Sequence, residues 1–218
     1  MKFWFSRKAL VAGASLLATL GAVQAHATDQ HSKHFQLVPN PKFVRCLARF
    51  PDDPSRPPTA DVFVTRGKLN DTMRLQLKNI QPGLGFDLFT VQNSTFKADG
   101  TPNGSSSRGL AWYQSDIEVG SGGTASVEIQ TILFDQIFGF DPDVSLAPTN
   151  TFHVGFWFDT PDDVVNCLAP GDSNPPTPFN GEHNAGPLAM ISLPDADSGL
   201  GPLCTNPDFS TNPVSCHP

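Results

Sequence analysis

The sequence predicts an all-β fold, an antiparallel β-sandwich of Greek-key or jelly-roll type with long loops. Runs of strand-forming residues recur along the chain and are separated by clusters rich in proline and glycine, a spacing typical of such folds. The 21 prolines and 18 glycines lie mostly between the runs, where they do not interrupt the hydrogen bonds of a sheet. No segment has a convincing helical period, so we expect no layer of helices.

Residues 1–27 are predicted to be a secretory signal peptide. Basic residues open the chain, and small and apolar residues follow from Ala9 to Val23, a stretch too short for a stable membrane span. Cleavage is expected near Ala25 or Ala27, which predicts a secreted protein, either extracellular or periplasmic. No later stretch is long and apolar enough to cross a bilayer, so no transmembrane segment is expected.

Residues 28–41 are predicted to be a flexible leader, because they are polar and end among prolines. A single sandwich domain is expected over residues 42–218, and its last part, from Asp195 to Pro218, is predicted to be a loop held by a disulfide. Eight strands are predicted within this domain, over residues 43–50, 61–67, 72–80, 85–92, 109–119, 124–134, 151–159 and 186–193.

The runs 109–119 and 124–134 are predicted to form a hairpin. Apolar residues fall mainly on odd positions in both runs, so the two sets share a face only across a loop of odd length. Residues 121–123, Ser-Gly-Gly, supply a three-residue loop with a glycine in the left-handed position. This register brings Asp116 near Glu128. Either a cation bridges the two carboxylates, or they extend into water, or the register differs.

The chain has four cysteines, all of them after the signal peptide. An even number in an exported chain predicts two disulfides, for which three pairings are possible. We favour Cys46 with Cys167, which would join the first strand to a late loop, and Cys204 with Cys216, which closes a short C-terminal loop. A cysteine metal site is disfavoured, because no two cysteines have the C-x-x-C spacing.

The overall charge excludes some classes of partner. Charged residues make up only 16% of the chain, and the formal net charge is -7. Nucleic acids and acidic membranes are bound through clustered lysine and arginine. We therefore expect no nucleic-acid partner.

The run 151–159, TFHVGFWFD, carries the first candidate site. Strand alternation places Phe152 and the even-numbered residues after it on a core face. On the other face, His153, Trp157 and Asp159 are predicted to line a ligand-binding site, with the glycine at position 155 leaving space between them. The alternative is a central strand that is covered on both sides, in which His153 is a buried histidine with its hydrogen bonds satisfied.

Residues 177–186, TPFNGEHNAG, carry the second candidate site. Glu182 and His183 follow an Asn-Gly turn, and together with His153 they are the predicted ligands of a divalent metal ion. Adjacent residues of a strand point to opposite faces, so Glu182 and His183 can share an ion only in a turn. The alternative is a polar turn with no chemical role.

Two fragments resemble the copper/zinc superoxide dismutases. Residues 79–89, NIQPGLGFDLF, resemble the strand-turn-strand that carries two copper-binding histidines in that family, but here those positions are Asp87 and Phe89. The stretch EHNAGPLAMI resembles the zinc-ligand stretch, with His183 at the histidine position and Pro187 in place of the aspartate. The resemblance implies a Greek-key sandwich. Without the paired histidines it implies no copper redox cycle.

The greater part of the chain resembles a family of uncharacterised secreted bacterial proteins. The stretches that carry the resemblance are GFDLFTVQ, LAWYQSDIE, TFHVGFWFD and TPFNGEHNAG. It implies a shared fold. The family brings no known activity, so no catalytic role is transferred from it.

The sequence therefore favours a secreted, non-enzymatic module that binds a surface, a carbohydrate or another protein. The charge is low, and no assembled catalytic motif is present. The alternative is a metal-binding protein or metal-dependent enzyme that uses His153, His183 and nearby carboxylates. An active relative of superoxide dismutase is the least favoured hypothesis.

Overall fold

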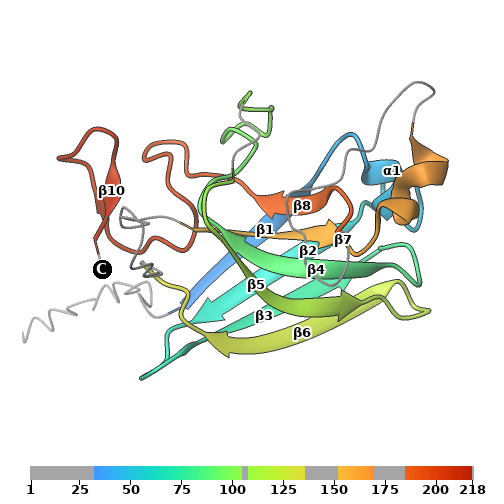
Figure 1. The fold of residues 1–218 in the computed structure, drawn as a ribbon, viewed down its shortest axis with the longest axis horizontal. Coiled ribbons are helices and arrows are strands. Elements are labelled where there is room, and N and C mark those ends of the chain that lie inside the picture. Colours follow the sequence, from blue (N-terminus) through green and yellow to red (C-terminus); the bar gives the residue numbers. More distant parts are fainter. Residues whose placement is uncertain (1–31, 105–107, 136–151, 169–184, 218) are drawn as a thin grey trace, which may run out of the picture.

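The computed structural model describes residues 32–104, 108–135, 152–168 and 185–217. The described residues form two short helices, α1 (Val44–Leu47) and the 3-10 helix η1 (Pro161–Cys167). Their strands are β1 (Ser32–Pro39), β2 (Thr59–Thr65), β3 (Asp71–Lys78), β4 (Gly85–Val91), β5 (Ala111–Glu118), β6 (Thr124–Thr131), β7 (His153–Phe158), β8 (Leu188–Ser192), β9 (Pro207–Asp208) and β10 (Ser215–Cys216). The predicted all-β class is confirmed (Figure 1).

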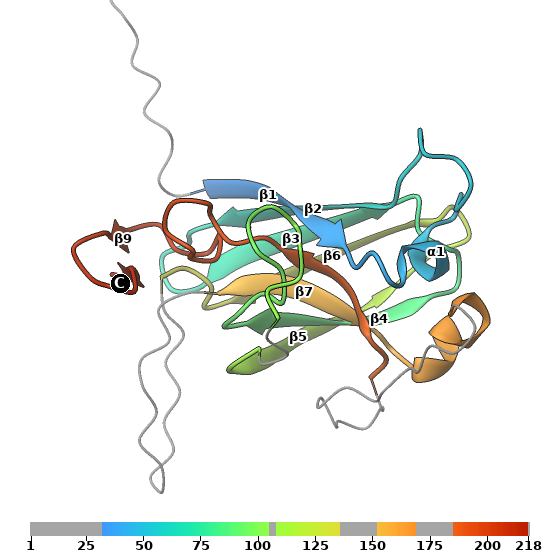
Figure 2. The ribbon, with the colours of Figure 1, turned by 90° about the horizontal axis from the view of Figure 1, so that it is seen from above.

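Eight of these strands form one antiparallel sheet in the order β5-β4-β7-β8-β1-β2-β3-β6. The sheet folds over, so that β1, β2, β3 and β6 form one layer and β4, β5 and β7 form the other (Figure 2). The two edge strands, β5 and β6, are connected by a short turn, and the sheet is nearly closed. Strands β9 and β10 form a small separate pair near the C-terminus.

The core lies between the two layers and follows from the two-residue period of the strands. In β2 and β3 every second side chain is buried, and these side chains are aliphatic apart from Met73 and Asp71. They meet phenylalanines from the opposite layer, among them Phe86 and Phe156, whose ring centroids lie 4.9 Å apart. Phenylalanine has no polar group that needs a partner, and this explains its use here.

Residues 32–39 were expected in a flexible leader, and that prediction is wrong for them. They form β1, which pairs with β2 on one side and with β8 on the other. Phe35 and Leu37 face the core while His34 and Gln36 face outward. The alternation is therefore that of a half-buried strand, although polar residues and the following prolines obscured it.

The first predicted strand, over residues 43–50, is also wrong. Its centre forms the single helical turn α1, which buries Cys46 and Leu47. Only Ala48 keeps an extended contact, an isolated bridge to Ile80. The other seven predicted strands are confirmed as β2 to β8, with ends that differ by a few residues.

Both predicted disulfides are confirmed. Cys46 and Cys167 join α1 to η1 with Cα atoms 5.5 Å apart, and Cys204 and Cys216 close the C-terminal loop with Cα atoms 5.8 Å apart. The disulfide Cys46–Cys167 therefore joins two short helices, whereas a strand and a loop were predicted at its two ends. No helix in the described part of the chain is long and apolar enough to cross a membrane.

The turn between β5 and β6 has the predicted glycine, Gly123, in the left-handed region at φ 73°. The strands beyond this turn diverge, so Asp116 pairs with Asp87 of β4, and Glu128 pairs with Arg74 of β3. The register that brought the two carboxylates together is therefore not the one adopted.

The pairing of β4 with β5 contains an irregularity between Leu88 and Phe89. This shift reverses the alternation in the first half of β5. Tyr113, expected on the buried face, is exposed as a result, and Trp112 packs against the core.

Candidate functional site

Strand β7 carries the residues predicted to line an open ligand-binding face. The structure covers both of its faces, and every residue of the strand is buried. Trp157 is 0% exposed and His153 is 2% exposed. The alternative interpretation, a central strand covered on both sides, therefore describes β7, and the face around Trp157 is closed to a ligand in this structure.

The cover over Trp157 is a second, smaller core outside the sandwich. Trp157 packs there with Phe89, Phe96 and Leu188. Phe96 belongs to the long connection between β4 and β5, and the guanidinium of Arg108, from the same connection, lies 5.2 Å from the centre of the indole ring. A cation over an aromatic face is attracted by the ring electrons. This connection thus closes the outer face of β7.

Gly155 marks a close approach of a neighbouring strand and not of a ligand. A Cβ at this position would lie 3.1 Å from both the Ile191 Cγ1 and the Met190 carbonyl oxygen of β8. Glycine in a strand has this role where another backbone comes near.

His153 is a buried histidine with a satisfied hydrogen bond. Its Nδ1 lies 3.1 Å from the Ser192 carbonyl oxygen and 3.1 Å from the Ser192 Oγ. Burial lowers the pKa of His153 to about 4, and the bond to Ser192 opposes this shift only in part. The imidazole is therefore neutral above pH 5, which suits a structural role in the core.

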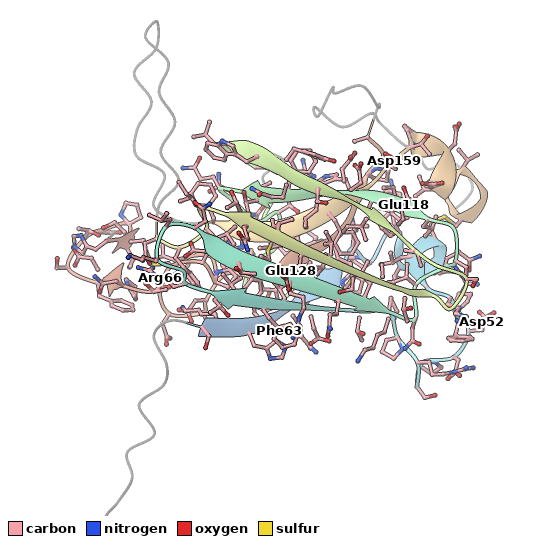
Figure 3. All side chains as sticks on the ribbon, turned by 90° about the horizontal axis from the view of Figure 1, so that it is seen from below. Asp52, Phe63, Arg66, Glu118, Glu128 and Asp159 are labelled. Atoms are coloured by element: carbon pink, nitrogen blue, oxygen red, sulfur yellow. A yellow bond between two sulfur atoms is a disulfide. The ribbon has the colours of Figure 1, made fainter. Side chains whose placement is uncertain are left out.

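Asp159 follows β7 and lies at the η1 end of the sheet, at a distance from the C-terminal strands. Its backbone N–H donates to the Gly85 carbonyl at 3.0 Å, and Glu118 pairs with Gly85 from the other side. Figure 3 shows Asp159 and Glu118 toward this end. Burial raises the pKa of Asp163, and the negative charges of Asp159 and Asp162 raise it further. Asp159 therefore lies near the carboxylates of Asp162 and Asp163 and does not form a ligand-binding face with Trp157.

Glu182 and His183 lie outside the described residues, so the metal site that they were predicted to share with the histidine of β7 stays a prediction. Within the described ranges, one group of three possible ligands lies close enough together for a single ion: Asp135, Cys204 and Cys216. The two cysteines are joined in a disulfide, and metals bind the thiolate. This group is therefore not a metal site.

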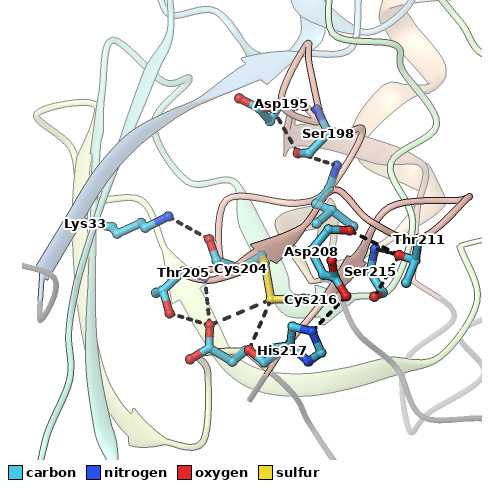
Figure 4. The surroundings of a disulfide bond; sticks show 12 residues. Lys33, Asp195, Ser198, Cys204, Thr205, Asp208, Thr211, Ser215, Cys216 and His217 are labelled. Carbon is cyan, nitrogen blue, oxygen red and sulfur yellow. Dashed lines mark hydrogen bonds and ion pairs between the residues drawn. A yellow bond between two sulfur atoms is a disulfide. The ribbon is translucent and has the colours of Figure 1, made fainter.

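A pocket of about 480 Å³ lies at the end of the sandwich opposite η1, between the start of β1 and the C-terminal segment, residues 193–209. Its volume is within the range of ligand-binding pockets, about 300–1,000 Å³. Figure 4 shows the disulfide Cys204–Cys216 in this region, with Lys33 on β1 and Asp195 and Ser198 on the segment. The lining residues are Lys33, His34, Phe35, Leu193, Pro194, Asp195, Asp197, Ser198, Leu200, Gly201, Pro202, Cys204, Thr205, Pro207 and Phe209.

Lys33 is the basic residue that joins the two walls of the pocket. Its Nζ donates a hydrogen bond to the Cys204 carbonyl at 2.7 Å. Burial lowers the pKa of the half-buried amine, and the carboxylates of Asp135 and Asp195 oppose that shift by favouring the ammonium. An amine with a perturbed pKa in a cleft is a feature of functional sites.

Asp195 organises the loop on the other wall. Its Oδ1 accepts hydrogen bonds from the backbone N–H groups of Asp197 and Ser198, at 3.1 and 2.8 Å, and from the Ser198 hydroxyl at 2.9 Å. These bonds lower the pKa of Asp195, and the two from Ser198 have the largest effect. An aspartate that binds the backbone two and three residues ahead fixes a turn, and this turn presents Asp197 to solvent at the pocket.

Asp135 holds the base of the C-terminal segment. It is buried, adopts a left-handed φ of 67°, and forms an ion pair with Arg66 from the end of β2. The backbone N–H of Thr205 donates to the other carboxylate oxygen at 2.7 Å, and its hydroxyl donates to the same oxygen. Together with the disulfide, these bonds fix the segment that forms one wall of the pocket.

Prolines, leucines and phenylalanines make up much of the remaining lining, together with the polar side chains of His34, Ser198 and Thr205. Phe209 is the most accessible of the aromatic residues in the lining, at 62% exposed, and lies next to β9. A concave apolar surface with a few fixed polar groups is the usual form of a small-molecule site. The arrangement can hold a ligand against rings and bond its polar groups to Lys33, Asp195 and Asp197.

The pocket was not predicted from the sequence. One wall fell in the predicted leader and the other in the predicted C-terminal loop. Two signals were available: the alternation that places Lys33 and Phe35 on one face of β1, and the turn sequence PDADSG at residues 194–199 beside a disulfide. Neither signal indicates that segments so far apart in sequence meet.

Comparisons of the chain with protein-family models, with curated proteins and with solved structures find no match.

Proposed function

We propose that this protein is an exported, non-enzymatic binding module whose ligand occupies the pocket between β1 and the C-terminal segment. The observation that carries the proposal is the pocket itself, in which one half-buried amine and two carboxylates lie among prolines, leucines and phenylalanines. Few polar groups placed on an apolar concave surface give a site its orientation and selectivity.

Export is supported by the predicted signal peptide and by the two disulfides. Cysteine pairs persist in oxidising compartments and are rare where thiols are kept reduced. Secretion to the periplasm or to the outside of the cell is therefore part of the proposal.

Binding is favoured over catalysis because two of the three charged groups named above, Lys33 and Asp195, are already engaged in holding the fold. Lys33 is bonded to the Cys204 carbonyl, and Asp195 is bonded to the turn that follows it. A general acid or base must be free to exchange a proton with a substrate. Groups committed to the fold are better suited to fixing the position of a ligand.

The proposal is tested by closing the pocket. Asp197→Trp places a large side chain at the opening, at an exposed position whose carboxylate is not part of the turn. Asp52→Trp is the matched control, because Asp52 is also exposed and lies at the other end of the molecule from Arg66, which contacts the base of the segment (Figure 3).

Both variants and the original protein are screened by thermal shift and calorimetry against a library of soluble sugars, peptides and small metabolites. We expect Asp197→Trp to abolish binding of any ligand found and Asp52→Trp to retain it. Ligands that bind equally to Asp197→Trp would show that the pocket is not the binding site.

A further inference from the structure

We propose that the ligand of this pocket is a neutral saccharide. The inference rests on the proposed function and deepens it by naming a chemical class. It follows from three properties of the lining: the mixture of charges, the supply of hydrogen-bonding groups and the exposed aromatic ring.

The charges of the lining oppose one another. Lys33 faces Asp195, and Asp197 lies on the same turn as Asp195. A cationic ligand would meet the ammonium, and an anionic ligand would meet two carboxylates. A like charge at close range costs free energy wherever the pocket excludes water. A ligand without net charge avoids both penalties.

The polar groups of the pocket require a ligand that both donates and accepts hydrogen bonds. A lysine ammonium has three N–H donors, of which the bond to Cys204 uses one. Carboxylates such as Asp197 only accept. A purely apolar ligand would remove water from these groups without replacing its hydrogen bonds, which is unfavourable. Sugar hydroxyls donate and accept, so one ring can satisfy both walls.

The exposed ring of Phe209 supplies the third property. It is part of a lining that also includes Pro202 and Pro207, and it is 62% exposed. An aromatic face carries a partial negative charge that attracts positively polarised edges. The C–H groups on one face of a sugar ring are such an edge, while the hydroxyls at the rim of the same ring point away toward polar groups.

The test uses the full exported protein and a panel of oligosaccharides in three sets: neutral, uronic-acid or sialylated, and free-amine. Binding is measured on an array and then by calorimetry for each set. We expect a neutral member to bind, Phe209→Ala to weaken it at least tenfold, and Tyr113→Ala to leave it unchanged. Tyr113 is the matched control, because it is an exposed aromatic residue outside the pocket.

A second variant separates a neutral ligand from a charged one. Asp197→Asn keeps a carbonyl acceptor but removes the negative charge, so binding of a neutral sugar should change less than threefold. Binding confined to the free-amine set and lost more than tenfold in Asp197→Asn would mean that the ligand is cationic. Binding confined to the acidic set and strengthened by that factor would mean that it is anionic. Either result overturns the inference.

The failure of the inference is distinct from the failure of the proposed function. If none of the saccharides binds, the neutral-sugar class is wrong. The proposed function survives that result only if another ligand binds and Asp197→Trp abolishes its binding.

Discussion

Lys33 Nζ and the carbonyl oxygen of Cys204 lie 2.7 Å apart and are joined by a hydrogen bond that spans 171 residues of the sequence. Through this bond β1 holds the C-terminal segment. The same two residues line the pocket, so the bond fixes the distance between its walls.

Replacing Lys33 should therefore weaken both the fold and the pocket. Lys33→Met keeps most of the side-chain length and removes the donor. We expect the free energy of unfolding to fall by about 1.5–2 kcal/mol, the lower part of the range for a hydrogen bond that involves a charged group, as measured by urea unfolding. Lys68→Met, at an exposed lysine near the same end of the sheet, should change it by less than half as much. Equal effects at both positions would contradict a structural role for Lys33.

The two disulfides should differ in their contribution to stability. Their sequence separations are 121 and 12 residues, and the loop-entropy relation gives about 5 kcal/mol for the longer loop and about 3 kcal/mol for the shorter one. Guanidinium unfolding of the Cys46→Ser/Cys167→Ser and Cys204→Ser/Cys216→Ser variants measures both values.

Ligand binding should depend more on the shorter disulfide than on the longer one, because only Cys204–Cys216 supports a wall of the pocket. We expect the variant without the shorter disulfide to lose ligand binding while it is still folded. If that variant binds as the original protein does, the bonds to Asp135 and the bond from Lys33 are sufficient to hold the segment without the disulfide.

Acid should destabilise the protein through His153. Its folded-state pKa of about 4 is below the ordinary histidine value of 6.5, so the unfolded chain binds more protons between these values and stability falls as the pH falls from 6.5 to 4. The shift corresponds to a loss of roughly 3 kcal/mol over this range. Below pH 4 this residue causes no further loss, because it is protonated in both states.

The variant His153→Asn keeps an acceptor or donor near Ser192 and removes the titration. Its stability, measured by urea unfolding at several pH values, should be nearly constant where the original protein loses this contribution. His34→Asn, at an exposed histidine, should retain the loss. If the slopes of the two variants agree, another group is responsible.

A side chain at position 155 should strain the contact between β7 and β8. The Cβ of Gly155→Ala would lie 3.1 Å from two atoms of β8, and overpacking of this kind costs about 1–3 kcal/mol. Gly122→Ala is the control, since its Cβ would meet only Thr124 Oγ1, at 3.6 Å. Thermal unfolding should show a lower midpoint for Gly155→Ala alone.

The strands of this fold were predictable because their side chains alternate. The even-numbered phenylalanines of the run 151–159 were placed on the core face from the sequence, and Phe152, Phe156 and Phe158 are buried between the layers. Alternation gives the two faces of a strand, but it does not say whether the second face is covered. For Trp157 that depends on Phe96 and Arg108, which belong to a loop without a regular pattern.

Two other features could not be read from local pattern. The exposure of Tyr113 follows from an irregular pairing between β4 and β5, and this is a property of two strands together. The pocket depends on the contact of Lys33 with Cys204, which only the complete order of strands in the sheet determines. The even cysteine count, in contrast, predicted two disulfides but left three pairings open, and the favoured pairing is the one observed.

The position of β1 between β2 and β8 has a consequence for synthesis of the protein. A ribosome completes β1 and β2 early, yet one side of β1 has no neighbour until β8 emerges about 150 residues later. Pairing between distant segments is slow, and an open strand edge invites association with other chains. We therefore expect the nascent chain to need protection from aggregation until β8 is made. A chain truncated before Leu188 should be recovered as aggregate.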